Sequence, residues 1–235
     1  MFRFSAWAAV LLAVLVVAAQ EAKAGIGFQP VSQEELKMAS EPLAPGAPAI
    51  ILYRQVERDD SPYTGHEDQY YRIKIFTEEG RKRADVEIPF FKEYQDVVNI
   101  KARTIKPDGS IVSFDGKVFE KQIVKSKGVK YFAKTFTLPD VEAGGIIEYY
   151  YAVVLRENYI YSSTWIVSEE LFTKRAQFSV KPYYGDNMQG FSVHAIWQFL
   201  PAGAIPPKEG ADHVFRMEVS NLPAFQTEDF MPPPN

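Results

Sequence analysis

Cysteine is absent from all 235 residues of the sequence. Its absence excludes disulfide bonds, thiolate metal ligands and any reaction that needs a cysteine nucleophile. Hydrophobic residues make up 46% of the chain, which is ordinary for a globular protein. The folded state must therefore be stabilised by burial of apolar side chains and not by covalent cross-links.

Histidine is nearly as scarce, with only His66, His194 and His213 in the chain. No two of them have the close spacing of a helix-borne metal motif such as H-E-x-x-H, so neither a metal site nor a catalytic residue is predicted. The acidic residues between 59 and 68 do not follow the ligand spacing of a calcium loop, and a strand connection is the favoured interpretation. We expect no cofactor, and the chain is not predicted to be an enzyme.

A surplus of positive charge is also lacking. The sequence has 26 Lys and Arg against 30 Asp and Glu, a net charge of -4. Nucleic-acid binding needs a basic surface, so nucleic acid is excluded as a partner. One basic cluster could contact an anionic cell-wall polymer, although a solvated hairpin is the favoured interpretation: Lys121, Lys125, Lys127, Lys130 and Lys134.

The single long apolar run lies at the N-terminus, where a basic residue precedes the small and apolar residues Ala6 to Ala19. This run is shorter than the ~20 residues of a membrane-spanning helix. The following Ala22-Lys23-Ala24 matches the small-x-small pattern of a signal peptidase site. We predict a signal peptide over residues 1–24, cleaved between Ala24 and Gly25, and an exported periplasmic or extracellular protein without a membrane span. An uncleaved membrane anchor is the alternative.

Residues 25–47 are predicted to form a lead-in segment before the main domain. Ser32 followed by Glu35 is a capping-box pattern, which predicts a short helix that ends near Ser40. Prolines 42, 45 and 48 break regular structure after it. We expect the segment to cover the edge of a sheet, whose unpaired backbone groups would otherwise be open to other chains.

From residue 48 to residue 222 apolar and polar residues alternate with a period of two, which is typical of strands. In Ala84–Phe90, for example, the even positions are apolar, whereas Asp85 and Glu87 fall on the other face. Pro107-Asp108-Gly109 predicts a hairpin turn between Ile105 and Phe114. The other predicted strands are Ile50–Val56, Tyr70–Phe76, Val97–Ile105, Val118–Val124, Tyr131–Leu138, Ile146–Leu155, Thr164–Val167, Phe172–Val180, Phe191–Phe199 and His213–Val219.

Strands joined by short turns, without alternating helices, favour an all-β fold. We predict an antiparallel β-sandwich over residues 48–222, immunoglobulin-like with extra strands. Residues 223–235 lose the alternation and end in Met-Pro-Pro-Pro-Asn, a composition typical of an extended connector. We expect this connector to lead to a further domain that the sequence does not contain.

Four stretches within residues 47–235 carry a family resemblance: RIKIFTEEGRKRADVEIPF, IKARTIKPDGSIVSFDGKVFEKQIV, FAKTFTLPDVEAGGIIEYYY and NLPAFQTEDFMPPPN. In their order and spacing they resemble the exported bacterial domain of unknown function that commonly precedes a transglutaminase-like domain. The resemblance implies a β-sandwich domain, of a kind without an established activity. It also implies a partner, a downstream transglutaminase-like domain that carries the cysteine, histidine and aspartate of the active site.

Aromatic residues are the remaining candidates for a binding surface. Tyr149 and Tyr151 share a strand face with apolar residues and are expected in the core, whereas Tyr150 shares its face with Glu148. Large rings on a sandwich pack into the core, against an adjoining domain or against a ligand. The candidates for contact with a ligand or an interface are Tyr150, Tyr159, Tyr161 and Trp165.

Two functions stay open at this point. The favoured hypothesis is a non-catalytic, exported accessory domain that positions a downstream catalytic domain or its substrate. The alternative is a glycan- or cell-wall-binding module, in which aromatic rings stack on sugars. A hydrolase that uses His66 or His213 with nearby carboxylates is a weaker third hypothesis.

Overall fold

The computed structural model describes residues 26–60, 65–126, 129–156, 165–183, 198, 200–201 and 203–225. The predicted signal peptide and its cleavage site at Ala24 and Gly25 lie outside these residues, as does most of the predicted strand Phe191–Phe199. Within the described residues, no helix is both long enough and apolar enough to cross a membrane.

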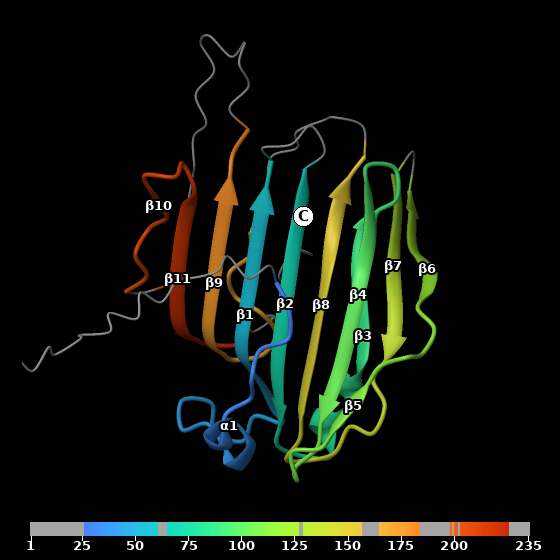
Figure 1. Cartoon of the computed structure of the whole chain (residues 1–235), viewed down its shortest axis with the longest axis vertical. Helices are drawn as coiled ribbons and strands as arrows, with labels where there is room; N and C mark the ends of the chain where they lie inside the picture. Colours follow the sequence, from blue (N-terminus) through green and yellow to red (C-terminus); the bar gives the residue numbers. More distant parts are fainter. Residues whose placement is uncertain are drawn as a thin grey trace, which may run out of the picture.

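Most of the described chain is built into two β-sheets, as the alternation predicts. The larger sheet has, among these residues, eight strands in the order β10-β11-β9-β1-β2-β8-β4-β5 (Figure 1). From one edge to the other they are β10 (Lys208–Glu209), β11 (Phe215–Leu222), β9 (Thr173–Lys181), β1 (Ala49–Asp59), β2 (His66–Ile75), β8 (Ile146–Leu155), β4 (Gln95–Ile105) and β5 (Ile111–Ser113).

The smaller sheet packs on one face of the larger one. It consists of β3 (Asp85–Phe91), β7 (Val129–Thr137) and β6 (Phe119–Ser126), in the order β3-β7-β6, and the 3-10 helix η1 (Glu79–Ala84) leads into β3. Alternate β3 residues Val86, Ile88 and Phe90 are buried between the sheets, where they form one core with residues such as Ile73 and Ile147. The apolar face that the alternation predicts for β3 is therefore the face in the core.

The predicted all-β sandwich is confirmed. Strand β8 has the predicted bounds, and the hairpin after β4 turns where it was expected. Gly109 takes a φ of +87°, and the Lys106 N–H donates to the Ser110 carbonyl oxygen at 2.8 Å. A positive φ is readily adopted by glycine because it has no Cβ, which explains the turn signal.

Three details differ from the sequence prediction. Strands β1 and β9 run parallel, so the larger sheet is mixed and not purely antiparallel. The strands divide eight to three among the described residues, whereas an immunoglobulin sandwich divides its strands almost evenly. Residues 165–167 form no strand; Trp165 and Val167 instead pack on a buried cluster that includes Phe178. Alternation specifies which side chains are buried, but not which strands are neighbours.

The lead-in contains one short helix, α1 (Gln33–Lys37), which ends three residues earlier than Ser40. Its capping box is confirmed: the Glu35 N–H donates to Ser32 Oγ at 3.1 Å, and the Ser32 N–H donates to Glu35 Oε2 at 2.7 Å. The side chains of Val31 and Leu36 pack on a cluster of buried residues that β1, β4 and β8 contribute.

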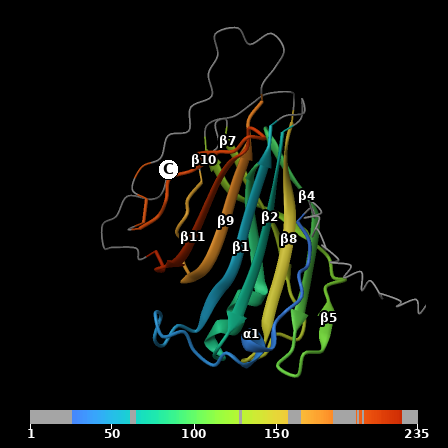
Figure 2. The same cartoon turned by 60° about the vertical axis from the view of Figure 1, so that its left-hand side comes forward.

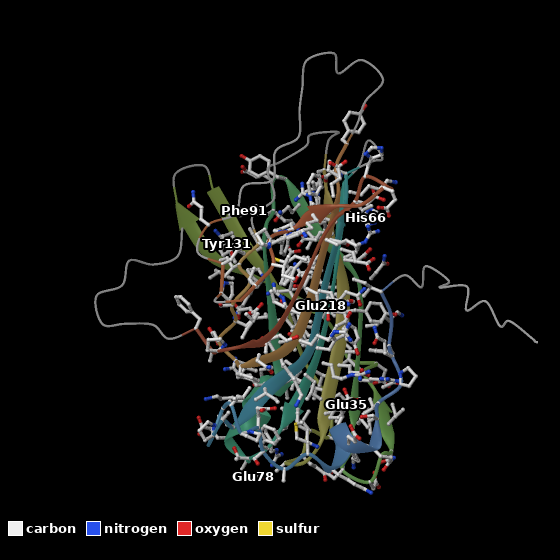
Figure 3. The ribbon with its side chains drawn as sticks, turned by 90° about the vertical axis from the view of Figure 1, so that its left-hand side faces the viewer. Glu35, His66, Glu78, Phe91, Tyr131 and Glu218 are labelled. Atoms are coloured by element: carbon white, nitrogen blue, oxygen red, sulfur yellow. The ribbon has the colours of Figure 1, made fainter. Side chains whose placement is uncertain are left out.

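The expectation that the lead-in covers a sheet edge was wrong. It lies across a face of the larger sheet, opposite the smaller sheet (Figures 1 and 2). Figure 3 shows Glu35 on one side of the larger sheet and Phe91 and Tyr131 of the smaller sheet on the other. The physical reason is that β1, β8 and β4 carry apolar residues on this second face too, and those residues need a cover.

A buried carboxylate lies at the centre of this covered face. Glu148 of β8 is opposite Arg72 of β2 and Arg103 of β4 in the strand register, and its side chain is fully buried. The Arg72 Nε donates to Glu148 Oε1 at 2.7 Å, Tyr70 Oη donates to the same oxygen, and Arg103 Nε donates to Oε2. Because both carboxylate oxygens are bonded and the charge is paired, burial of Glu148 is tolerated.

The two arginines also bind the lead-in. Arg72 Nη1 lies 2.8 Å from Glu35 Oε1, and Arg72 Nη2 donates to the Gln29 carbonyl oxygen at 2.9 Å. Arg103 Nη2 donates to the same Gln29 oxygen, also at 2.9 Å. One buried carboxylate therefore orients two guanidinium groups, and these groups hold the lead-in on the sheet.

Lys74 of β2 makes a further link to the lead-in. Its buried Nζ donates to the carbonyl oxygens of Leu36 and Gly144, both at 2.7 Å. Burial lowers the pKa of the Lys74 amine. The end of α1 is thus tied to the loop that leads into β8.

We predict that Glu148→Ala lowers the free energy of unfolding by about 3–5 kcal/mol, because it leaves two arginines of a buried network without their shared partner. Urea unfolding followed by far-UV circular dichroism measures the change. Glu218→Ala is the matched control, since this exposed carboxylate also contacts an arginine, Arg175 at 2.8 Å, and should cost about 1 kcal/mol or less. Equal losses for both variants would contradict the role given to Glu148.

Candidate functional site

A cleft of about 760 Å³ opens between the two sheets, and we call it the inter-sheet cleft. One wall consists of Asp85–Pro89 of β3 with Arg83, and the other wall is segment 165–171. Strands β1, β2 and β8 form the floor. The volume falls in the range of clefts that bind small molecules or short peptide segments.

Tyrosines dominate the floor of the cleft. Tyr71 of β2 stacks on Tyr149 of β8, with ring centroids 5.1 Å apart and an interplanar angle of 21°. The hydroxyl of Tyr151 donates to Gln69 Oε1 at 3.0 Å, and that of Tyr71 donates to Glu169 Oε1 at 3.1 Å. The Tyr71 hydroxyl connects the floor to the 165–171 wall, the Tyr151 hydroxyl links two strands of the floor, and together they give the cleft a polar, aromatic base.

Arg54 of β1 joins the floor to the same wall. Its Nη1 donates to the Ile166 carbonyl oxygen at 2.9 Å and lies 2.9 Å from Glu169 Oε1. The guanidinium carbon lies 5.4 Å from the centroid of the Tyr71 ring and 5.2 Å from that of Phe178, within the range of cation–π contact. Its buried Nε has no hydrogen-bond partner among the described residues.

The described lining is acidic. Five carboxylates line the cleft against two guanidinium groups, those of Arg54 and Arg83. Both arginines are already paired with carboxylates of the 165–171 wall: Arg54 with Glu169, and Arg83 Nη1 with Glu170 Oε2 at 3.0 Å. The lining carboxylates are Glu67, Asp85, Glu87, Glu169 and Glu170.

Of the predicted aromatic candidates, the two that the structure describes, Tyr150 and Trp165, lie on opposite faces of the larger sheet. Trp165 lines the inter-sheet cleft, where its Nε1 donates to Glu67 Oε2 at 3.3 Å and its ring packs 5.6 Å from that of Phe178. Tyr150 lies on the opposite face of the larger sheet, beneath the lead-in, with its ring 5.1 Å from that of Phe28. Tyr159 and Tyr161 lie outside the described residues.

Sequence reasoning missed Arg54 and Glu169. A charged residue inside the alternating strand β1 was the available signal for Arg54. Simple alternation, however, would place Ile51 and Arg54 on opposite faces of the strand. An irregularity in register between Ile51 and Tyr53 puts both side chains on the face that lines the cleft. Glu169 belongs to segment 165–171, which forms neither a strand nor a helix, so no periodic pattern could predict where its side chain lies.

Neither His66 nor His213 is among the residues that the structure places in the lining of the inter-sheet cleft. His66 Nε2 lies 3.5 Å from Asp68 Oδ2, and His213 Nδ1 lies 2.8 Å from Glu209 Oε1, all on partly or fully exposed side chains. Across the described part of the chain, no group of three or more His, Asp or Glu side chains is arranged to hold a metal ion.

Comparisons with known proteins agree with this fold. The family model described as Domain of Unknown Function with solved-structure structure (DUF3857) matches residues 61–226. A solved protein from Parabacteroides distasonis, named "putative protease", matches with a TM-score of 0.58 and 16% identity, over 80% of this chain and 38% of that chain. The chain therefore spans well under half of that protein, and the likeness concerns the fold alone.

A second solved structure, yeast LTA4 hydrolase in complex with bestatin, matches with a TM-score of 0.36 and 10% identity, over 83% of this chain and 31% of that chain. This likeness is too low to carry an argument. A search of the curated proteins finds no significant match.

We predict that Tyr71, Tyr149 and Tyr151 do not ionise near pH 10 while the domain is folded. Burial raises the pKa of each of these hydroxyls in the folded state, whereas in the unfolded chain the pKa is about 10. Their contribution to stability is therefore complete below pH 10 and is lost as the pH rises further, because only the unfolded state then releases the protons.

Tyrosinate absorbance at 295 nm, followed together with circular dichroism, measures this behaviour. A late phase that coincides with unfolding is expected, with a smaller amplitude in Tyr149→Phe. Ionisation of every tyrosine near pH 10 in a still folded protein would contradict the prediction.

Proposed function

The chain belongs to the DUF3857 family of domains of unknown function, and from this premise we propose that it is a non-catalytic, exported interaction domain. In this proposal the inter-sheet cleft binds a polypeptide segment and positions it for a transglutaminase-like catalytic domain of the same protein. The observation that carries the proposal is a cleft with the volume and polar, aromatic lining of a binding site but without a thiolate, amine or imidazole among its described lining residues.

The course of the chain after β11 supports a positioning role. The Phe225 N–H donates to the Glu169 carbonyl oxygen at 2.7 Å, so the last described residue is bound to a wall of the inter-sheet cleft. A catalytic domain attached beyond this point would be tethered beside the cleft. A short tether gives a bound segment a high effective concentration at a neighbouring active site.

The comparison with the Parabacteroides distasonis protein is consistent with this arrangement. The matched part is 38% of that chain, which leaves ample length outside the match for a further domain. Export is proposed from the apolar run and the Ala22-Lys23-Ala24 pattern at the N-terminus.

Glycan binding is the second candidate, because Trp165 lines the cleft. A ring that stacks on a sugar must present a free face. Trp165 packs on Phe178, and Tyr71 and Tyr149 stack on each other, so these rings use at least part of their faces within the protein. The arrangement therefore supports a polypeptide ligand better than a sugar platform.

A library of fluorescent ten-residue peptides, added to the purified chain without its signal segment, tests the proposal. We expect saturable binding by fluorescence anisotropy and no cleavage by mass spectrometry. Trp165→Ala should weaken binding about tenfold, as truncation of a central aromatic contact does. Phe119→Ala is the control, since this exposed aromatic residue lies outside the described cleft lining and should leave binding unchanged.

Two outcomes would overturn the proposal. Cleavage that co-purifies with the chain and is lost in Glu169→Gln would make the domain an enzyme. Retention on purified peptidoglycan that is lost in Trp165→Ala, together with no peptide binding, would favour the glycan candidate instead.

A further inference from the structure

Strand β3 offers an open edge to the inter-sheet cleft. It pairs with β7 on one side, and among the described residues no strand pairs with its other side. Residues Asp85 to Pro89 line the cleft along this open side. An open edge presents unpaired N–H and C=O groups to which another extended chain can add.

The register of the smaller sheet shows which residues point toward the opening. The Leu138 N–H donates to the Ala84 carbonyl oxygen at 2.9 Å, across the pair of Asp85 and Thr137. In an antiparallel ladder this bond makes Asp85 and Thr137 a non-hydrogen-bonded pair, so the even-numbered β3 residues bond to β7. The backbone groups of Glu87 and Pro89 therefore point toward the cleft.

Pro89 agrees with this assignment. Proline has no N–H, and inside a sheet it is tolerated where its nitrogen faces away from the partner strand. Its place in the sequence also signals that β3 is an edge strand.

Local contacts close the two ends of the open edge but not its centre. The Asp85 N–H donates to the Lys82 carbonyl oxygen. At the other end, the Phe91 N–H donates to Gln95 Oε1 at 3.1 Å, and the Phe91 carbonyl oxygen accepts from the Tyr94 N–H at 3.0 Å. Among the residues that the structure describes, the N–H and C=O of Glu87 thus form the central open pair.

The charge of the cleft restricts the ligand. The two guanidinium groups of the lining are each paired with a carboxylate, Glu169 or Glu170. Of the other three carboxylates, Glu87 contacts Lys121, Asp85 accepts from the Thr137 hydroxyl, and Glu67 accepts from Trp165. The described part of the lining therefore keeps a negative surplus, which favours a cationic ligand and opposes an anionic one.

We propose that the inter-sheet cleft binds an extended, Lys- or Arg-bearing polypeptide that adds as a strand to the open edge of β3 and pairs with the backbone of Glu87. This inference rests on the proposed function and specifies its ligand class and binding mode. A polypeptide fits because its backbone groups on one side repeat every second residue, about 6.8 Å, as do those of β3. A sugar polymer has no such matched ladder of donors and acceptors.

Fluorescence anisotropy with a labelled peptide of alternating Lys and Val tests the proposal on the chain without its signal segment. Glu87→Pro removes the one N–H that points into the cleft without removing a ladder bond to β7. We expect this variant to bind the peptide at least tenfold more weakly. Glu87→Ala removes the same side chain but keeps the N–H; because the Glu87 carboxylate is already paired with Lys121, the affinity of this variant should fall by less than threefold. Circular dichroism confirms that both variants are folded.

Two modified peptides test the same pairing on the unaltered protein. Methylation of every second backbone nitrogen blocks one edge of the peptide, and methylation of the other set blocks the opposite edge. We expect one pattern to abolish binding and the other to preserve it, because only one edge faces β3. A peptide of alternating Glu and Val should not bind.

The outcomes separate this inference from the proposed function. If the Lys–Val peptide binds wild type and Glu87→Pro equally, or tolerates both methylation patterns, strand addition is wrong although peptide binding stands. If the Glu–Val peptide binds as well as the Lys–Val peptide, the charge argument is wrong. If no peptide binds, both proposals fail.

Discussion

The central strands of the larger sheet have to bury both of their faces, and this constraint organises the rest of the molecule. Without cysteine, apolar burial must supply the stability that cross-links would otherwise add. One face is covered by the smaller sheet and by segment 165–171, the other by the lead-in. The side chains of successive residues in β2 and β8 therefore point into two different buried regions, one on each face of the sheet. Ile73 and Ile147 belong to the first, and Lys74 and Glu148 belong to the second.

The two interiors differ in chemistry. The face under the smaller sheet is mainly aliphatic and aromatic, whereas the face under the lead-in contains Glu148 with Arg72 and Arg103. A buried ion network of this kind adds little stability compared with apolar packing, but it is costly to break, because a lone charge would remain in the interior. The network thus specifies where the lead-in lies more than how tightly it is held.

The same division produces the inter-sheet cleft. The smaller sheet covers only part of its face, and segment 165–171 covers another part, so a polar channel stays open between β3 and that segment. Arg54 and Glu169 hold the segment against the floor, and the Tyr71 hydroxyl completes the contact. In the proposed function, the ligand and the tether of the catalytic domain are side by side, since the Phe225 N–H donates to the Glu169 carbonyl oxygen at a wall of the cleft.

By itself the sequence determined the all-β class, most strand positions, the capping box at Ser32 and the turn at Gly109, because each depends on the period or chemistry of a few neighbouring residues. Tertiary structure alone decided the parallel pairing of β1 with β9, the burial of Glu148 and the separation of Tyr150 from Trp165. These features depend on which distant strands become neighbours and on what covers each face. Alternation assigns a residue to one of two faces but does not say which face meets which partner.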